Sequence, residues 1–210
     1  MEIVRYELGP MANNTYLIVD EATRDAAIVD PSFDSESLWP EIEGRNVHIR
    51  YILNTHAHFD HIIGNAFYVE KSGAPLALHR ADLDRLRALP DHARRYRFEA
   101  VPSPEPTLFL EDGQTLKLGN TPIRVVHTPG HSPGSVTFLF DDVAIVGDVL
   151  FEGSIGRTDL PGGSLQTLLH SIRTQLLTLP DATHVLPGHN APTTIGQERA
   201  ANPHLQDLEP

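Results

Sequence analysis

The sequence contains no cysteine, so disulfide bonds, thiol catalysis and sulfur ligands to a metal are excluded. Basic residues are also scarce, because 16 Lys and Arg stand against 28 Asp and Glu and leave a formal net charge of −12. Binding to nucleic acid depends on Lys and Arg that neutralise phosphates. We therefore expect no nucleic-acid partner. A small anionic substrate is not excluded, since a few Arg side chains can bind carboxylates.

Long apolar runs are absent as well, and the longest ones have the length of a strand. We therefore predict no membrane-spanning segment and no membrane partner. The first residues lack the basic start and apolar stretch of a signal peptide, which makes a cytoplasmic location the expectation. A length of 210 residues with 40% hydrophobic content predicts one domain, residues 1–210, with a sizeable core. The oligomeric state stays open.

The apolar pattern predicts a mixed α/β fold. Strands are expected at 14–19, 26–30 and 49–54, the first two paired, and helices at 35–44, 60–72, 81–88 and 165–177. Ser164 is expected to cap the last helix. Short turns between strands, such as Asp141-Asp142, indicate that the sheets are mixed rather than purely parallel.

The most informative segment is 56–61, which reads His-Ala-His-Phe-Asp-His directly after the apolar run 49–53. In an extended segment alternate side chains point the same way, so His56 and His58 can close on one ion. If the chain then turns into a helix, Asp60 and His61 diverge toward a second ion. Imidazole nitrogen and carboxylate oxygen suit Zn²⁺, Fe²⁺ or Mn²⁺. The segment thus predicts two incomplete sites for divalent ions.

Three later segments have the same sequence pattern: an apolar, strand-like run ends in a turn of small residues that carries His or Asp. The turns are Thr-Pro-Gly-His at 128–131, Gly-Asp at 147–148 and Pro-Gly-His at 187–189. Functional side chains usually occupy such turns at strand ends. The expected ligands are His56, His58 and His131 for one ion and Asp60, His61 and His189 for the other, with Asp148 as the bridge.

These motifs together resemble the metallo-β-lactamase superfamily. Residues 147–163 further resemble its glyoxalase II-like branch, particularly the short single-domain members. The resemblance extends from residue 14 to residue 203, and all seven ligand positions hold the expected residue types. It implies a four-layer αββα sandwich, in which two mixed β-sheets are flanked by helices.

The expected site and the resemblance predict a binuclear metal-dependent hydrolase. A hydroxide that bridges two cations is nucleophilic at neutral pH and would attack a carbonyl. Asp60 would orient this hydroxide or manage its proton. Because a thiolate leaves well, a thioester is the natural substrate, and glyoxalase II-type proteins hydrolyse S-2-hydroxyacylglutathione thioesters. Two zinc ions are the expected cofactors, with iron or manganese as alternatives.

Residues outside the ligand set also carry expectations. Ligand histidines usually need a carboxylate or carbonyl on their second nitrogen, and resembling proteins use an Asp at the position of Asp30. Arg157 is a candidate for substrate binding, although a local ion pair with Asp159 is the favoured interpretation. Six arginines favour a solvated helical face, and the alternative is that they border the cleft and bind carboxylates: Arg80, Arg85, Arg87, Arg94, Arg95 and Arg97.

The sequence departs from full-length glyoxalase II after His189. Longer members carry a C-terminal helical domain whose basic residues bind glutathione, whereas 21 residues follow His189 here and Arg199 is their sole basic residue. We expect that contact with glutathione to be missing, which leaves the natural thioester or ester open.

Other functions compete with thioester hydrolysis. A mononuclear-iron persulfide dioxygenase would use His56, His131 and Asp148, and its family resembles this chain across 156–159. A lactonase, an esterase, a β-lactamase-like enzyme and a non-catalytic binding protein are further alternatives.

One motif indicates a different chemistry altogether. Residues 130–134 fit the Gly-x-Ser-x-Gly elbow of serine hydrolases, but that elbow requires a helix after Ser132, and 136–140 read as a strand.

We expect surface or core roles rather than metal binding for the remaining histidines: His48, His79, His92, His127, His170, His184 and His204.

Overall fold

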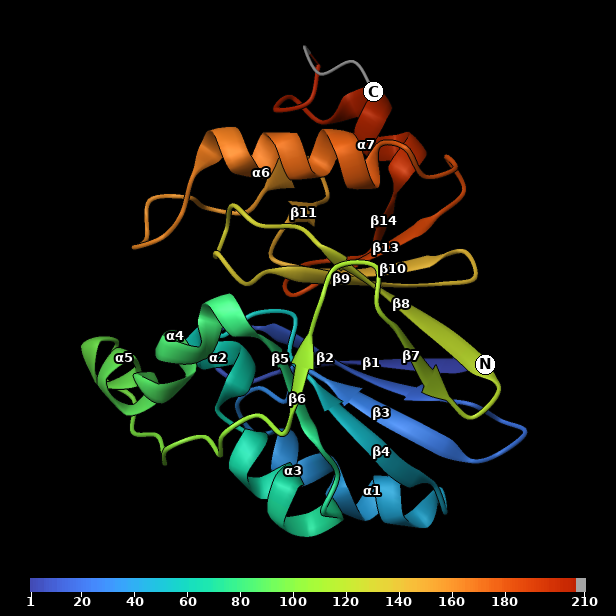
Figure 1. Ribbon diagram of the computed structural model, residues 1–210, viewed down its shortest axis with the longest axis vertical. Helices are drawn as coiled ribbons and strands as arrows, with labels where there is room; N and C mark the ends of the chain where they lie inside the picture. The colour runs from blue at the N-terminus through green and yellow to red at the C-terminus, as the bar shows by residue number, and fades with distance from the viewer. Residues whose placement is uncertain (207–210) are drawn as a thin grey trace.

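The computed structural model describes residues 1–206, which form two six-stranded β-sheets stacked face to face. Helices α1 (Trp39–Gly44) and α3 (Asn65–Ser72) lie on the outer side of the first sheet. Helices α6 (Leu165–Ser171) and α7 (Ile195–Ala201) lie on the outer side of the second (Figure 1). The expected four-layer αββα sandwich is confirmed. Within residues 1–206, every helix is too short or too polar to cross a bilayer.

The first sheet has the order β1-β2-β3-β4-β5-β6. Its strands are β1 (Glu2–Leu8), β2 (Asn13–Val19), β3 (Asp25–Val29), β4 (His48–Leu53), β5 (Leu76–His79) and β6 (Leu108–Leu110). The predicted pairing of β2 with β3 is correct, with Tyr16 opposite Val29. From β3 onward the strands run parallel, so β3 and β4 deliver Asp30 and the histidine-rich segment to the same edge.

The second sheet has the order β14-β13-β10-β9-β8-β7. Its strands are β7 (Thr115–Leu118), β8 (Thr121–His127), β9 (Val136–Phe140), β10 (Val143–Gly147), β13 (His184–Pro187) and β14 (Thr193–Thr194). Strands β10 and β13 are parallel, and Gly147 pairs with Pro187 at their ends. This register places the turn that carries Asp148 beside the turn that carries His189. A separate hairpin, β11 (Leu150–Phe151) and β12 (Ser154–Ile155), follows β10.

Strand β2 shows how the two-residue period builds the layers. Tyr16 and Ile18 face the core between the sheets, whereas Leu17 and Val19 face the helices on the other side. All four side chains are buried, because this internal strand is covered on both faces. A third apolar cluster lies between the second sheet and α6.

The helix expected at 60–72 is two helices, α2 (Phe59–Ile62) and α3, so the single-helix prediction is wrong. At the break, the Gly64 N–H donates to the Pro31 carbonyl at 2.8 Å. A Cβ atom at Gly64 would lie 2.8 Å from the same oxygen, so only glycine fits here. The break docks the histidine-rich turn against the segment that follows Asp30.

The segment 81–88, expected to be one helix, consists of a 3₁₀ turn (Arg80–Asp82) followed by α4 (Leu83–Arg87). A further helix that was not predicted, α5 (Leu89–Arg95), comes next and has Pro90 in its first turn. Proline ends a helix from within but is favourable at its start. The Ser164 cap is correct, since its Oγ accepts the Thr167 N–H. After α6 the chain continues as a π-helical turn (Ile172–Leu176), and a 3₁₀ turn (Ser35–Leu38) precedes α1.

Candidate metal centre

Four turns from both sheets meet at the end of the sandwich where α2 lies (Figure 1). Each turn follows the carboxyl end of a strand: β4, β8, β10 and β13. The structure thus brings together all seven residues expected as ligands, which the sequence places at 56–61, 131, 148 and 189.

The first group consists of His56, His58 and His131, whose ligand atoms lie within 4.8 Å of one another. His58 Nδ1 is 2.7 Å from His131 Nε2. The Nδ1–H of His131 donates to the Arg157 carbonyl at 2.8 Å, and a carbonyl can only accept. This bond fixes the tautomer of His131 and leaves its Nε2 free to bind a cation.

The second group consists of Asp60, His61 and His189. Asp60 Oδ2 is 3.5 Å from His61 Nε2 and 3.3 Å from His189 Nε2. The Nδ1–H of His189 donates to the Met11 carbonyl at 3.0 Å, which again directs Nε2 at the group. Ligand atoms about 3.3 Å apart are what bonds of about 2.0–2.1 Å around one tetrahedral ion produce.

Asp148 lies between the two groups. Its Oδ1 is 3.5 Å from His61 Nε2, and its Oδ2 is 3.6 Å from His131 Nε2 and 3.7 Å from His189 Nε2. One carboxylate therefore faces histidines of both groups, in the bridging position that the sequence predicts.

Several buried atoms of this cluster lack a hydrogen-bond partner within residues 1–206. They are His56 Nε2, His58 Nε2, His61 Nε2 and Asp148 Oδ1. A buried polar atom without a partner costs about 1–3 kcal/mol, so a cluster of them calls for a bound group. The donor set of imidazole nitrogens and carboxylate oxygens fits two divalent cations.

The electrostatics of the cluster favour bound cations. Burial lowers the pKa of His56 and of His58 well below the usual value, so both rings are neutral, as ligands must be. Burial also lowers the pKa of His61, but the Asp148 and Asp60 carboxylates outweigh it and leave this pKa raised. Burial raises the pKa of Asp60, yet His61 and hydrogen bonds bring it to about 2. The ionised carboxylates therefore stabilise positive charge at the centre.

Asp30 is placed against both groups. Its Oδ2 accepts the His61 Nδ1–H at 3.1 Å and the Thr55 hydroxyl at 2.6 Å. Thr55 Oγ1 in turn lies 3.0 Å from His56 Nδ1, so the hydroxyl that donates to Asp30 can accept from His56. Asp30 thereby orients one histidine of each group, directly for His61 and through Thr55 for His56.

We expect Asp30→Asn to weaken metal binding about 10- to 100-fold, because an amide offers one acceptor where the carboxylate offers two. Competition with a chromophoric chelator measures the affinity. Asp34→Asn is the matched control, since Asp34 is exposed and both positions have a positive φ, 49° and 60°. Equal affinities of the two variants would contradict the role of Asp30.

Asp82 is a site residue that the sequence reasoning missed. This fully buried carboxylate accepts the Ala57 N–H at 2.9 Å, the Ser132 hydroxyl at 2.7 Å and the Gly134 N–H at 2.9 Å. It therefore ties the turn of His56 and His58 to the turn of His131. Its only sequence signal is an acidic residue within a basic stretch.

Asn13 was missed as well. This buried residue lies at the start of β2, and its Nδ2 donates to Asp60 Oδ2 at 2.9 Å, which fixes the orientation of that carboxylate. The serine-elbow alternative fails, because the Ser132 hydroxyl bonds Asp82 and Ser135 and the following segment is strand β9, as expected.

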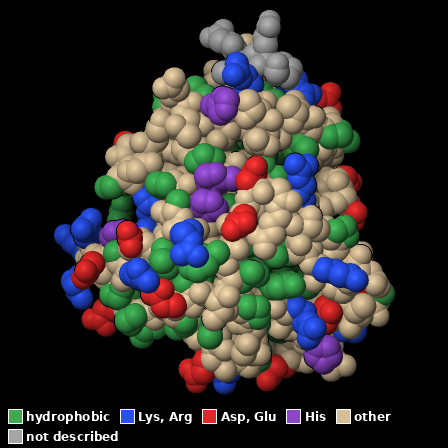
Figure 2. All heavy atoms as spheres, in the orientation of Figure 1, with side chains coloured by type: hydrophobic (Ala, Val, Ile, Leu, Met, Phe, Trp, Pro, Cys, Tyr) green, Lys and Arg blue, Asp and Glu red, His purple; other side chains and the backbone are tan. Residues whose placement is uncertain are grey.

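A cavity of about 510 Å³ opens onto the cluster, with Asp60, His131 and Asp148 in its wall. Histidine side chains gather in the middle of the face in Figure 2, with Lys or Arg side chains beside them. Arg85 and Arg95 line the cavity, as the alternative interpretation of the arginine segment expects, and Arg95 is also exposed. Arg157 forms the expected ion pair with Asp159 at 2.7 Å and also lines the cavity.

Comparisons with known proteins agree with this geometry. The sequence profile of the metallo-beta-lactamase superfamily matches residues 8–189. Hydroxyacylglutathione hydrolase GloC of Haemophilus influenzae is 38% identical over 200 residues, covering 91% of this chain and 92% of that protein.

Solved structures agree as well. BLEG-1, a B3 metallo-beta-lactamase, is 37% identical with a TM-score of 0.91, covering 98% of this chain and 100% of the other. TTHA1623 in a di-iron-bound form is 37% identical with a TM-score of 0.88, covering 95% of this chain and 98% of the other. ETHE1 of Myxococcus xanthus is 27% identical with a TM-score of 0.82, covering 97% of this chain and 84% of the other. The chain therefore belongs to the metallo-beta-lactamase superfamily.

Proposed function

We propose that this chain is a binuclear metal-dependent hydrolase that cleaves a thioester of the S-2-hydroxyacylglutathione type. The observation that carries the proposal is the pair of three-residue groups with Asp148 between them at the wall of a cavity. The similarity to a hydroxyacylglutathione hydrolase over more than nine-tenths of both chains supports the choice of substrate.

His56, His58 and His131 would hold one ion, and Asp60, His61 and His189 the other. Two divalent ions, when bound, supply a water that is nucleophilic at neutral pH and a Lewis acid that polarises the carbonyl oxygen. Zinc is our first choice, and iron and manganese use the same ligands. The di-iron form of TTHA1623 makes iron the first alternative.

The side chains of the site then have separate tasks. Asp60 lines the cavity, is ionised because its pKa is about 2, and is held by Asn13, so it can orient the attacking water or accept its proton. The hydrogen bonds from His131 and His189 to backbone carbonyls keep both rings in place during turnover. Phe59 and Phe151 give the cavity apolar walls that exclude water from the thioester.

Metal analysis of the purified protein, combined with a substrate panel, tests this function. We expect two equivalents of transition metal, hydrolysis of S-lactoylglutathione, and loss of that activity when a chelator removes the metal, with recovery on adding it back. The panel also contains a simple acyl thioester, a lactone, a β-lactam and glutathione persulfide. Undiminished thioester turnover by metal-free protein would overturn the proposal.

A mononuclear-iron persulfide dioxygenase is the second candidate, because 156–159 resembles that branch. It would use His56, His131 and Asp148 and leave the second group without a role. The completeness of the second group favours the hydrolase. Oxygen consumption with glutathione persulfide, together with one equivalent of iron, would reverse this preference.

A further inference from the structure

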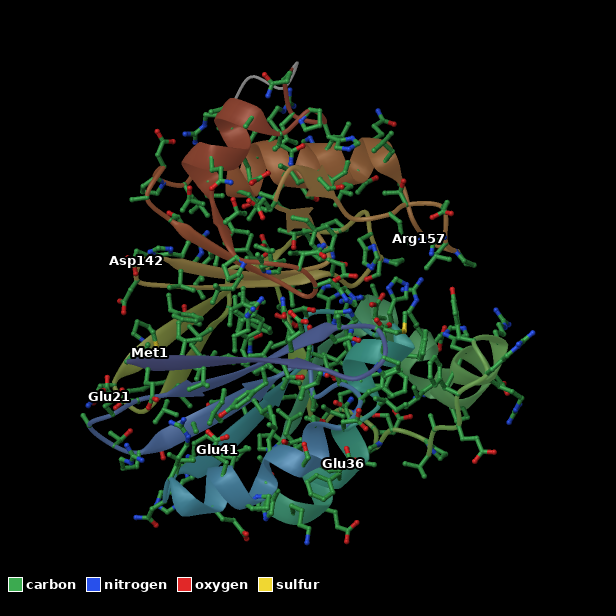
Figure 3. The ribbon with its side chains drawn as sticks, turned by 180° about the vertical axis from the view of Figure 1, so that it is seen from behind. Met1, Glu21, Glu36, Glu41, Asp142 and Arg157 are labelled. Carbon is green, nitrogen blue, oxygen red and sulfur yellow. The ribbon has the colours of Figure 1, made fainter. Side chains whose placement is uncertain are left out.

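Helices α4 and α5 form one wall of the cavity, and the proposed reaction gives the residues of this wall no role. Arg85, His92 and Arg95 line the cavity from this wall, and Arg157, Leu160 and Pro161 line it from the loop after β12. In Figure 3 the labelled Arg157 lies on the side of the molecule where the green helices α4 and α5 are. The two segments also touch directly, because the Arg85 guanidinium donates to the Pro161 carbonyl.

Three arginines line the cavity, but two of them are already neutralised. Arg85 pairs with Asp82 at 2.8 Å, and Arg157 pairs with Asp159 at 2.7 Å. Among residues 1–206, Arg95 has neither an ion-pair partner nor a side-chain hydrogen bond, although it lines the cavity. Its charge is thus available to a ligand.

Arg95 and Arg85 both act on His92, which lies on the same wall. Burial lowers the pKa of His92, and the Arg95 and Arg85 cations lower it further. The protein as a whole carries a formal charge of −12, which disfavours the approach of an anion. Arg95, which among residues 1–206 is the cavity arginine without an acidic partner, attracts an anion locally and opposes this effect at one place.

An apolar surface separates this charge from the metal centre. Phe59 immediately precedes the ligand Asp60, and its ring stacks on Tyr96, the neighbour of Arg95, with centroids 4.9 Å apart and planes at 20°. Both rings line the cavity. Phe59 and Tyr96 would therefore give apolar contacts to a substrate that extends from the metal centre toward Arg95.

We propose that Arg95 binds a carboxylate of the substrate and makes the site selective for thioesters that carry an anionic group remote from the reacting carbonyl. This inference rests on the proposed function for its substrate chemistry. Arg95 would supply a charge-assisted contact to that carboxylate.

The test compares two thioesters with the same lactoyl group, one on glutathione and one on the neutral thiol N-acetylcysteamine. We expect Arg95→Gln to raise KM for the glutathione thioester about 10-fold with kcat unchanged, the effect of losing one charge-assisted hydrogen bond at an exposed site. The KM for the neutral thioester should stay the same. Added salt should raise the wild-type KM toward that of the variant, and Arg95→Lys should retain part of the advantage.

Arg94→Gln is the matched control. Arg94 is the preceding residue on α5, pairs with Asp91 at 2.9 Å and does not line the cavity, so its loss should leave both KM values unchanged. Equal KM changes for the two thioesters in Arg95→Gln would overturn the role of Arg95 while hydrolysis itself stands.

A binding measurement separates this inference from the proposed function. NMR titration of each protein with glutathione should show weaker binding to Arg95→Gln than to the wild type and to Arg94→Gln. Equal binding to all three would overturn the inference. If the wild type hydrolyses neither thioester, the proposed function fails, and the titration still decides whether Arg95 binds the anion.

Discussion

Asp148→Asn is expected to lower kcat/KM for thioester hydrolysis about 10³-fold, or about 4 kcal/mol of transition-state stabilisation. The carboxylate faces both groups of ligands and its side chain is 13% exposed. Burial raises its pKa, but His61 and the other histidines outweigh burial and hold the pKa well below the usual value, so the group is charged. Asparagine keeps the shape and removes the charge that two cations would share.

The measurement combines steady-state kinetics with metal analysis of the same sample, because loss of a bridge should lower metal content as well. Asp142→Asn is the control. Asp142 lies in the exposed turn before β10, the strand that ends next to Asp148, and Figure 3 shows it on the opposite side of the molecule from Arg157. Full activity and full metal content in Asp148→Asn would contradict the bridging role.

Asp82→Ala is expected to lower the free energy of unfolding by about 3–5 kcal/mol. The substitution leaves the Arg85 guanidinium, whose side chain is 11% exposed, without its partner. It also leaves the Ala57 and Gly134 N–H donors without an acceptor, since both donate to this fully buried carboxylate. Unsatisfied buried donors add to the cost of an unpaired charge.

Urea denaturation of the metal-free proteins measures this effect without a contribution from bound ions. Asp84→Ala is the matched control, because Asp84 lies two residues along, is fully exposed and faces Arg87 only at 3.7 Å. Its denaturation midpoint should stay at the wild-type value. A midpoint for Asp82→Ala equal to that of Asp84→Ala would show that the bonds between the two turns carry no stability.

The strands were predictable from the sequence wherever local signals, such as apolar runs and turn residues, mark them. The run 14–19 lies in β2, which begins one residue earlier at Asn13, and the run 136–140 is β9 with the same bounds. Apolar runs and the Gly or Pro turns that end them are local signals, so the four turns with their His and Asp residues were found together with the strands.

The helices near the site were less predictable because their ends depend on distant partners. The helix at 60–72 breaks at Gly64, where the chain packs on Pro31, and nothing within the helix sequence marks that contact. Helix α5 was not predicted; it begins directly after the helix expected at 81–88 and has Pro90 in its first turn.

The sequence by itself determined the chemistry of the centre, since His, Asp and the absence of cysteine fix which ions the seven side chains suit. Only the tertiary structure decided which residues hold that centre in place and which charge faces the cavity. Asp82 lies 25 residues from Ala57 and 50 from Ser132, and sequence separation carries no information about such contacts. Arg94 and Arg95 are chemically identical neighbours, and the packing of α5 alone makes one a surface ion pair and the other a cavity residue.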